Sequence, residues 1–410
     1  MEDEQEPPLQ PRTQIQHRVL FLTVCAAGIG GTFQFGYNLS IINAPTLHIQ
    51  EFTNETWWAR TGWPLPDHLV LLVWSLIVSL YPLGGLFGAL LAGPFAIKLG
   101  RKKSLLVNNI FVVAAATLFG FSRRAGSFEM IMLGRLLMGI SAALQRLRGT
   151  TEVMVELAEL EEERAACQGG RARRPWELFQ DGALRRQVIS LVVLSSAMEL
   201  CGNDSIYAYA SSVFREAGVP QEKVQYAIVG TGCCELLTAF ISCVVIERVG
   251  RRVLLMGGYC LMTCWGSVFT VALCLQSSFP WMPYLAMSCI FAFILSFGIG
   301  PAGVTGILAT ELFDQKARPA AYMVCGAIMW TMLFLVGLGF PFLMEGLSHF
   351  LYVPFLGVCV CGAIYTGFFL PETKGKTFLE ISEELHRLNF PGQSQSPTWR
   401  GPEVIRSTEL

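Results

Sequence analysis

Charged residues are scarce in this sequence of 410 residues. They make up 15% of the chain, whereas hydrophobic residues make up 52% and the mean hydropathy is +0.47. A soluble domain usually carries about 25% charged residues. The net charge is −1, which argues against the strongly basic surface of a nucleic-acid-binding protein. The composition therefore predicts a membrane protein with no nucleic-acid partner.

Patterns that would define an enzyme or a secreted protein are also missing. The 13 cysteines lie mostly in apolar blocks and lack the paired spacing and nearby histidines of a zinc site. The sequence contains no phosphate-binding loop, pair of histidine ligands or nucleophile elbow. The polar segment 1–17 does not have the pattern of a removable signal peptide. We expect no catalytic role, no metal and no cofactor.

Long blocks almost free of charge are what the sequence has instead. A bilayer core of about 30 Å is crossed by roughly 20 apolar residues in a helix. Helices are expected because lipid cannot satisfy exposed backbone polar groups. Ten spans are predicted, at residues 19–41, 69–97, 104–121, 128–143, 187–212, 224–246, 253–275, 283–310, 319–344 and 350–370. Gly298–Gly303, which contains Pro301, is expected to interrupt the eighth of these spans.

Basic residues predict the orientation of the spans, because positively charged loops stay in the cytosol. They place both termini in the cytosol, and the loop 42–68, with Arg60 as its only lysine or arginine, outside. Asn54, in an Asn-Glu-Thr sequon of that loop, is predicted to be glycosylated. The predicted regions are a cytosolic N-terminus 1–18, a truncated transmembrane half 19–143, a cytosolic helical linker 144–186, a second transmembrane half 187–370 and a cytosolic tail 371–410.

An internal repeat divides the chain into unequal halves. Residues 97–106 resemble residues 246–255, and each segment is a basic turn that follows two spans. The second half has four spans after its turn, whereas the first half has two. Two spans are therefore predicted to be missing from the first half, where apolar sequence meets Arg146 and Arg148 abruptly. Transporters are often built from such repeats, with the substrate bound between them.

A set of motifs then makes a family recognisable. The motifs are Gln34–Asn38 with Ile42–Pro45, Leu99–Lys103, Gly134–Leu137, Glu247–Arg252, Glu311–Phe313 with Arg318–Ala321, Trp330 and Pro371–Gly375. Together, over about residues 18–388, they resemble the facilitative hexose transporters, in the sugar porter branch of the major facilitator superfamily.

The resemblance implies an all-α polytopic membrane protein with a major-facilitator-type fold. Family members have twelve spans, so a chain with about ten would have an incomplete N-terminal half. The resemblance also implies downhill transport of a hexose such as glucose or fructose, by alternating access, without a cofactor and in the plasma membrane. The expected partners are the hexose and the lipid bilayer, and homo- or hetero-oligomers with related transporters stay open.

Candidate substrate-binding residues include three carboxylates. The family motif of the seventh span aligns with 198–204, where Glu199 and Asp204 replace amides, and Glu235 stands at an asparagine position of the next span. A carboxylate at the centre of a membrane helix costs about 2.5–3.5 kcal/mol, so it is a candidate site by default. The alternative is a protonated or paired acid that fastens helices together.

Three further candidates are uncharged. Phe297 and Trp330 match the family and could stack on a sugar face or simply pack. Gln34 could line the cavity or bond a neighbouring helix.

Gate residues are implied by the resemblance on the cytosolic face. Paired charges at an opening interface can hold one state and break in the other. Anchoring of positive loops in the cytosol is the alternative. The candidates are Arg101, Arg135, Glu247, Arg248, Arg251, Arg252, Glu311 and Arg318.

Two functions of different classes remain at this point. The first is hexose transport by the shortened chain. The second is a transport-dead membrane protein that is degraded or that modulates a full-length relative, because the missing spans would line one side of the family's cavity. An ion channel is disfavoured, since the sequence has no pore-loop pattern.

Overall fold

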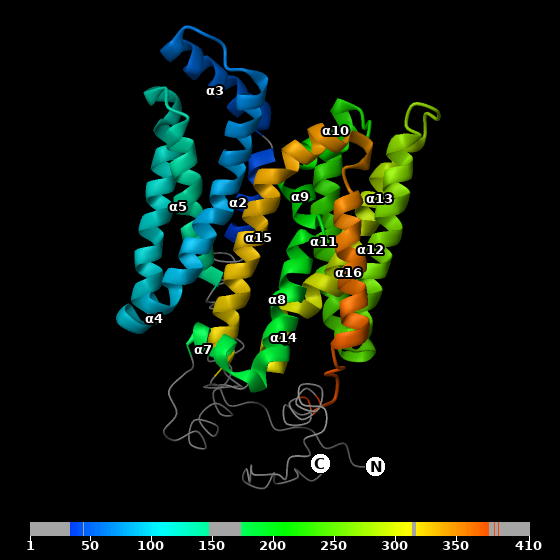
Figure 1. Ribbon diagram of the computed structural model, residues 1–410. Coiled ribbons are helices and arrows are strands. Elements are labelled where there is room, and N and C mark those ends of the chain that lie inside the picture. Colours follow the sequence, from blue (N-terminus) through cyan, green and yellow to red (C-terminus); the bar gives the residue numbers. More distant parts are fainter. Residues whose placement is uncertain are drawn as a thin grey trace, which may run out of the picture.

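The computed structural model describes residues 33–43, 45–146, 174–313, 317–376, 381 and 384. Within these ranges it leaves out some side chains, among them those of 33–35, 92–106, 145–146 and 247. The described residues form helices and connecting turns, without a strand (Figure 1). Residues 147–173 of the predicted helical linker 144–186 lie outside the described residues.

The N-terminal half contributes the helices that Figure 1 colours blue to teal. They are α2 (Phe33–Ser40), the 3-10 turn η2 (Ile41–Asn43), α3 (Thr46–Thr61), α4 (Asp67–Ala125) and α5 (Glu129–Arg146). The linker resumes with α7 (Pro175–Gln180) and η3 (Gly182–Leu184). Helices α3 and α7 lie at opposite ends of the bundle (Figure 1).

The C-terminal half contains the remaining helices, coloured green to orange in Figure 1. They are α8 (Arg185–Leu200), α9 (Asn203–Ala208), α10 (Ala210–Glu216), α11 (Gln221–Val249), α12 (Arg251–Cys274), α13 (Met282–Phe297), the π-helical turn η4 (Gly298–Ala302), α14 (Gly303–Leu312), α15 (Arg318–Leu347), η5 (Ser348–Phe350) and α16 (Val353–Phe369). Among the described residues, five segments are long and apolar enough to cross a membrane: 67–91, 221–246, 251–274, 282–312 and 318–350.

Helix α4 contains two of the predicted spans. A straight helix of its 59 residues would be about 88 Å long. The much shorter α5 nevertheless touches both parts of α4, because Gly139 of α5 lies against Tyr81 and Gly134 lies against Phe119. The two contacts require α4 to turn back on itself, as Figure 1 shows. The turn agrees with the predicted boundary between the spans 69–97 and 104–121.

Glycines let the helices of the N-terminal half approach closely. A Cβ at Gly84 or Gly88 would overlap with the backbone of α5, and a Cβ at Gly139 would overlap with the backbone of Tyr81. Small residues are common where membrane helices pack, because lipid supplies no hydrophobic force and close packing must replace it. This tight contact makes α4 and α5 one unit.

The predicted span 187–212 is not a single helix, which corrects the sequence-based expectation. The chain breaks at Gly202, which has a φ of +91°, and again at Tyr209, which has a φ of −130°. Glycine adopts the left-handed conformation without a steric penalty. A Cβ at Gly202 would also overlap with the ring of Phe355. The break leaves the short helix α9 in the middle of the span.

The expected interruption at Gly298–Gly303 has a milder form. The residues form a π-helical turn that joins α13 to α14, and Pro301 is buried inside it. Gly300 lies against Gly258 of α12, where a side chain would not fit. The span therefore bends here without losing its helical course, and the true discontinuity of this half lies in α8–α10.

The two halves meet where α4 packs on α15 (Figure 1). The ring of Trp330 stands edge-on to Tyr81, with 6.0 Å between the ring centroids. A Cβ at Gly85 would overlap with the same tryptophan ring. Ala142, Ala143, Met329 and Leu333 complete this apolar cluster.

Candidate substrate site and ion network

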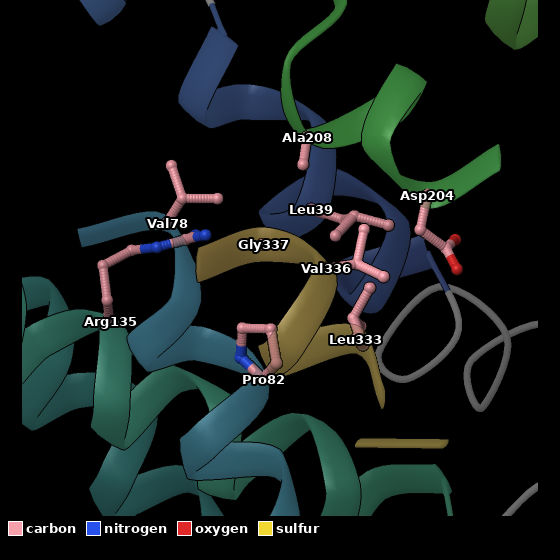
Figure 2. A pocket seen from close by; sticks show the side chains of 9 residues that line it. All are labelled: Leu39, Val78, Pro82, Arg135, Asp204, Ala208, Leu333, Val336 and Gly337. Atoms are coloured by element: carbon pink, nitrogen blue, oxygen red, sulfur yellow. The ribbon is translucent and has the colours of Figure 1, made fainter. Parts of the chain in front are cut away.

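A small cavity lies between the halves. It is lined by residues of five helices, α2, α4, α5, α9 and α15: Leu39, Val78, Pro82, Arg135, Asp204, Ala208, Leu333, Val336 and Gly337 (Figure 2). Its volume is about 10 Å³, which is room for one water molecule. Small-molecule sites usually measure about 300–1,000 Å³. This cavity is therefore too small for a hexose as it stands.

Arg135 brings a buried positive charge to this cavity. Its Nη1 donates to the carbonyl of Asn38 at 2.8 Å, and its Nε donates to the carbonyl of Ile77 at 3.4 Å. The guanidinium also lies over the ring of Tyr81, 4.7 Å from the centroid. The residue expected at the cytosolic gate is therefore found among α2, α4 and α5, beside the cavity.

Asp204 lies on the other side of the cavity, in the first turn of α9. Figure 2 shows its carboxylate pointing away from Arg135. It is close enough to Glu235 of α11 for electrostatic interaction, and the phenol of Tyr207 lies within range of both acids. Glu235 is exposed on the surface of α11. Two of the predicted carboxylates thus form one acidic group at the break between α8 and α9.

Glu199 has a different environment. It is 5% exposed near the end of α8 and interacts electrostatically with Cys201 and with Tyr259 of α12. It does not line the cavity described above. The three predicted carboxylates therefore divide into an acidic pair, Asp204 with Glu235, and a buried acid on the α12 side of α8.

Asn203 is a residue that the sequence reasoning did not select. It is completely buried, and its amide lies within reach of the Tyr207 hydroxyl but makes no hydrogen bond of good geometry in the described part of the chain. Buried polar groups are nearly always hydrogen-bonded, so such a side chain needs an explanation. Its position between Gly202 and Asp204, in the middle of an apolar span, is the signal that could have identified it.

The aromatic candidates are enclosed by protein in this conformation. Trp330 is 1% exposed in the α4–α15 contact, and Phe297 is 9% exposed at the end of α13. Either ring could meet a sugar only after the surrounding helices move. Gln34 is the second residue of α2, and its side chain lies outside the described residues.

An ion network joins three segments at the end of the C-terminal half where α12 begins. Nε of Arg251 donates to Oε1 of Glu311 at 2.9 Å, and the hydroxyl of Thr373 donates to Oε2 of Glu311 at 2.5 Å. Arg251 and Glu311 are about one-fifth exposed, at 20% and 19%. The predicted gate residues of this half thus meet across α12, α14 and the segment after α16.

Glu372 holds the start of α12 and was not selected from the sequence. Its Oε1 accepts the backbone N–H of Arg251 at 2.9 Å, and its Oε2 accepts that of Arg252 at 3.1 Å. It also accepts the N–H groups of Thr373 and Lys374. Partial burial opposes the charged form, but these four hydrogen bonds outweigh it and lower the pKa of Glu372. The carboxylate satisfies N–H groups that a helix start leaves open.

The remaining gate candidates differ in whether they form hydrogen bonds. The guanidinium of Arg252 donates to the carbonyl of Gly367, and the carbonyl of Arg248 accepts from Nζ of Lys374 at 2.5 Å. Nε of Arg318 is buried without a hydrogen-bond partner among the described residues. The side chains of Arg101 and Glu247 lie outside the described residues.

The predicted glycosylation site lies on α3. Asn54 is exposed, and its Oδ1 accepts the backbone N–H of Leu65 at 3.1 Å. Arg60 of the same helix pairs with Glu129 at 2.5 Å and donates to the carbonyl of Gly126 at 2.7 Å. These bonds tie α3 to the turn between α4 and α5. No group of three or more His, Cys, Asp or Glu side chains in the described part of the chain could hold a metal ion.

Comparison with known proteins now defines the class. The chain matches the model of the family "Sugar (and other) transporter" over residues 22–145 and 141–385. The helical, two-halved fold with a small central cavity agrees with this match. The chain belongs to this family of transporters, and it is a multi-pass membrane protein of the major-facilitator type with an incomplete N-terminal half.

Individual relatives make the comparison sharper. The chain is 68% identical to human facilitated glucose transporter member 11 over 492 positions, which cover 97% of this chain and 99% of the relative. It is 34% identical to human facilitated glucose transporter member 5 over 466 positions, with 90% and 93% covered. The resemblance to the sugar porters is thus confirmed.

The first alignment also shows that part of the relative's sequence is absent from this chain. It is 492 positions long, whereas this chain has 410 residues, so at least 82 positions of the alignment have no residue here. The two family matches meet at residues 141–145, where α5 ends. The predicted loss from the first half lies at this junction.

Solved structures show the same fold. A proton:xylose symporter of the major facilitator superfamily, XylE bound to 6-bromo-6-deoxy-D-glucose, matches with a TM-score of 0.65 at 17% identity, over 88% of this chain and 98% of that chain. The inward-open xylose transporter XylE from E. coli matches with the same TM-score and identity, over 89% and 99%. At this identity the match concerns the fold alone.

Proposed function

We propose that the chain carries a hexose such as glucose or fructose downhill across the plasma membrane by alternating access. The observation that carries the proposal is the polar group at the broken span: Asp204 lines a cavity between the two halves, Asn203 is its buried neighbour in the chain, and Glu235 is within electrostatic range of Asp204. Amides and carboxylates can form the several hydrogen bonds that sugar hydroxyls need. The similarity to the two human glucose transporters supports the same substrate class.

The proposed cycle follows from the size of the cavity. Because it holds about one water molecule, a hexose enters only when the halves part on one side. The ion network of Arg251, Glu311 and Thr373 is the device that we assign to the cytosolic side. Ion pairs of this kind can hold one state and break in the other. Both termini are cytosolic in this proposal, and Asn54 carries the glycan on the outer side.

A second function is supported by a separate observation. Helix α11 is the least buried of the five candidate spans, at 18% of its apolar window. A carrier that lacks two spans of its cavity wall would fail to transport. In that case the protein is transport-dead, and is degraded or modulates a full-length relative. The oligomeric state, as a homo- or hetero-oligomer with related transporters, belongs to this alternative.

Uptake measurements separate the two functions. Labelled glucose and fructose are supplied to cells that express the chain, and uptake is divided by the amount of glycosylated protein at the surface. Saturable uptake above mock-transfected cells, accelerated by unlabelled sugar on the far side, is expected of a carrier. Surface protein without uptake would favour the transport-dead alternative.

Two variants tie the uptake to the proposed site. Asn203→Leu removes the buried amide, and we expect uptake to fall by about tenfold, since a hydrogen bond to a polar ligand contributes about 0.5–1.5 kcal/mol. Glu345→Gln is the matched control, because Glu345 is exposed near the end of α15. Equal uptake by Asn203→Leu and Glu345→Gln, at equal surface amounts, would exclude Asn203 from the site.

A further inference from the structure

Helix α9 presents two different faces to its surroundings, since residues four apart lie on the same side of a helix. Asp204 and Ala208 form the first face and line the cavity between the halves (Figure 2). Asn203 and Tyr207 form a neighbouring face and do not line this cavity. They are 0% and 9% exposed. The polar groups of this second face therefore need an explanation other than the cavity wall.

Tyr207 reaches from α9 to α11. In the described part of the chain, α9 packs mainly on α2, α8, α10, α13 and α15, rather than on α11. The Tyr207 hydroxyl nevertheless lies within hydrogen-bonding reach of Glu235 on α11, and within electrostatic range of Cys234. The same hydroxyl is within reach of the Asn203 amide. A phenol can donate one hydrogen bond and accept another, so Tyr207 can join the two polar groups.

Glu235 lies on the polar side of α11, together with the buried residues Thr231, Thr238 and Ser242. The hydroxyls of Thr231 and Thr238 donate to carbonyls of their own helix, at 2.7 Å each, and so are already engaged. The side chain of Glu235 is exposed.

The orientation of the Glu235 carboxylate has to be fixed from another helix. An exposed glutamate can adopt many rotamers, and holding it in one costs conformational entropy. Asp204 is within electrostatic range, but two ionised carboxylates repel each other. Tyr207 offers a hydroxyl that can donate to Glu235, and this hydroxyl is itself buried and adjacent to Asn203.

We propose that Tyr207 is a positioning residue of the candidate sugar site, and that the link from Asn203 through Tyr207 to Glu235 sets the preference among hexoses. The inference rests on the transport function proposed above. The Tyr207 hydroxyl accepts from the Asn203 amide and donates to the Glu235 carboxylate, which holds Glu235 toward Asp204. Neither contact has good geometry here, and such bonds often tighten when a ligand binds.

The link gives the site its selectivity because it fixes the acceptors that α9 and α11 offer to sugar hydroxyls. Hexoses differ in the directions of these hydroxyls, and acceptors held in one arrangement distinguish them better than mobile ones. Tyr207 itself does not contact the sugar in this scheme.

The test compares Tyr207→Phe, which removes only the hydroxyl, with Tyr226→Phe as the matched control. Tyr226 is 79% exposed on the opposite side of α11 from Glu235. Uptake of labelled glucose and fructose is measured per surface molecule. Tyr207→Phe should change the ratio of the two KM values by about fivefold, as expected for one lost hydrogen bond, at an unchanged maximal rate. Tyr226→Phe should change neither KM value.

A double variant separates positioning from packing. If Tyr207 acts through Glu235, adding Tyr207→Phe to Glu235→Ala should not shift the KM ratio beyond the effect of Glu235→Ala alone. Additive shifts would show that Tyr207 acts by another route and would overturn the proposal. An unchanged ratio in Tyr207→Phe, at normal surface amounts, would overturn it as well.

A binding measurement keeps this inference separate from the proposed function. Glucose or fructose is added to the purified wild-type protein and to Tyr207→Phe in detergent, and the rise in thermal midpoint is measured for each sugar. If the wild type binds both sugars but carries neither, the proposed function fails. A changed ratio of the two rises in Tyr207→Phe would then still support the inference. The same ratio in both proteins, or no rise in the wild type, would overturn it.

Discussion

The first part of α4 and helix α11 hold equivalent places in the two halves, yet their surroundings differ. Half of the apolar window in 67–91 is buried, against 18% of the window in α11. The α4 segment is covered by α5 and α15, with Gly85 pressed against Trp330. Helix α11 packs mainly on elements of its own half. Equivalent spans of a repeat can therefore differ in how much of their surface the protein covers.

The largest expected effect comes from breaking the contact that remains. Gly85→Ala places a methyl group into the ring of Trp330, and overpacking of this kind costs about 1–3 kcal/mol. Gly232→Ala on the equivalent helix has open space and should not destabilise the protein. Thermal midpoints of the purified variants in detergent test the difference. Equal midpoints for the two variants would show that the α4–α15 contact does not hold the halves together.

A smaller effect is expected on substrate choice. Glu235→Gln changes the charge beside Asp204, and we expect the ratio of glucose to fructose uptake to shift by about tenfold, since hydrogen bonds to charged groups contribute about 1.5–3 kcal/mol. Glu311→Gln, in the cytosolic network, should leave this ratio unchanged. Equal shifts in the two variants would contradict a role for Glu235 in the site.

A third effect concerns the basic turn that follows α11. Glu372→Ala removes the cap of α12 and should cost about 1 kcal/mol, as at other helix starts. The pKa of Glu372 is lowered in the folded state, so its contribution is present above the unfolded value of about 4.3 and is lost as the pH falls through the lower folded value. The wild-type midpoint should therefore drop in acid, and the variant should lack this part of the drop. An identical acid profile would assign the pH dependence to other groups.

The smallest effect is expected away from both inter-half faces. Arg60→Ala removes an exposed ion pair with Glu129, and exposed pairs contribute little because water screens them. All partners of Arg60 lie in the N-terminal half, so uptake and thermal midpoint should be unchanged. A loss of uptake at normal surface amounts would show that α3 takes part in opening the outer side.

The predicted spans follow the observed helices closely where the helices are regular. The spans 224–246, 253–275 and 319–344 correspond to α11, α12 and α15, because apolar length alone identifies a membrane helix. The prediction was wrong in treating 187–212 as continuous. Apolar composition does not reveal the left-handed turn at Gly202, which depends on the nearby ring of Phe355.

The site was predicted in part. Mid-span carboxylates were recognisable because charge inside a membrane is costly, and the structure brings Asp204 and Glu235 within electrostatic range of each other. Glu199 could not be separated from them without knowing which side of α8 it occupies. Asn203 and Glu372 were missed because their importance depends on unsatisfied or satisfied hydrogen bonds, which have no pattern in sequence.

The sequence by itself determined the class of the protein, the order of its spans and the unequal length of its halves, because the hydrophobic length and the repeat of basic turns are local properties. Only the tertiary structure decided which surfaces meet. The covering of Trp330 by α4, the small size of the cavity between the halves and the low burial of α11 all depend on contacts between residues far apart in the chain. Such contacts are set by packing between helices, which a pattern along one helix does not contain.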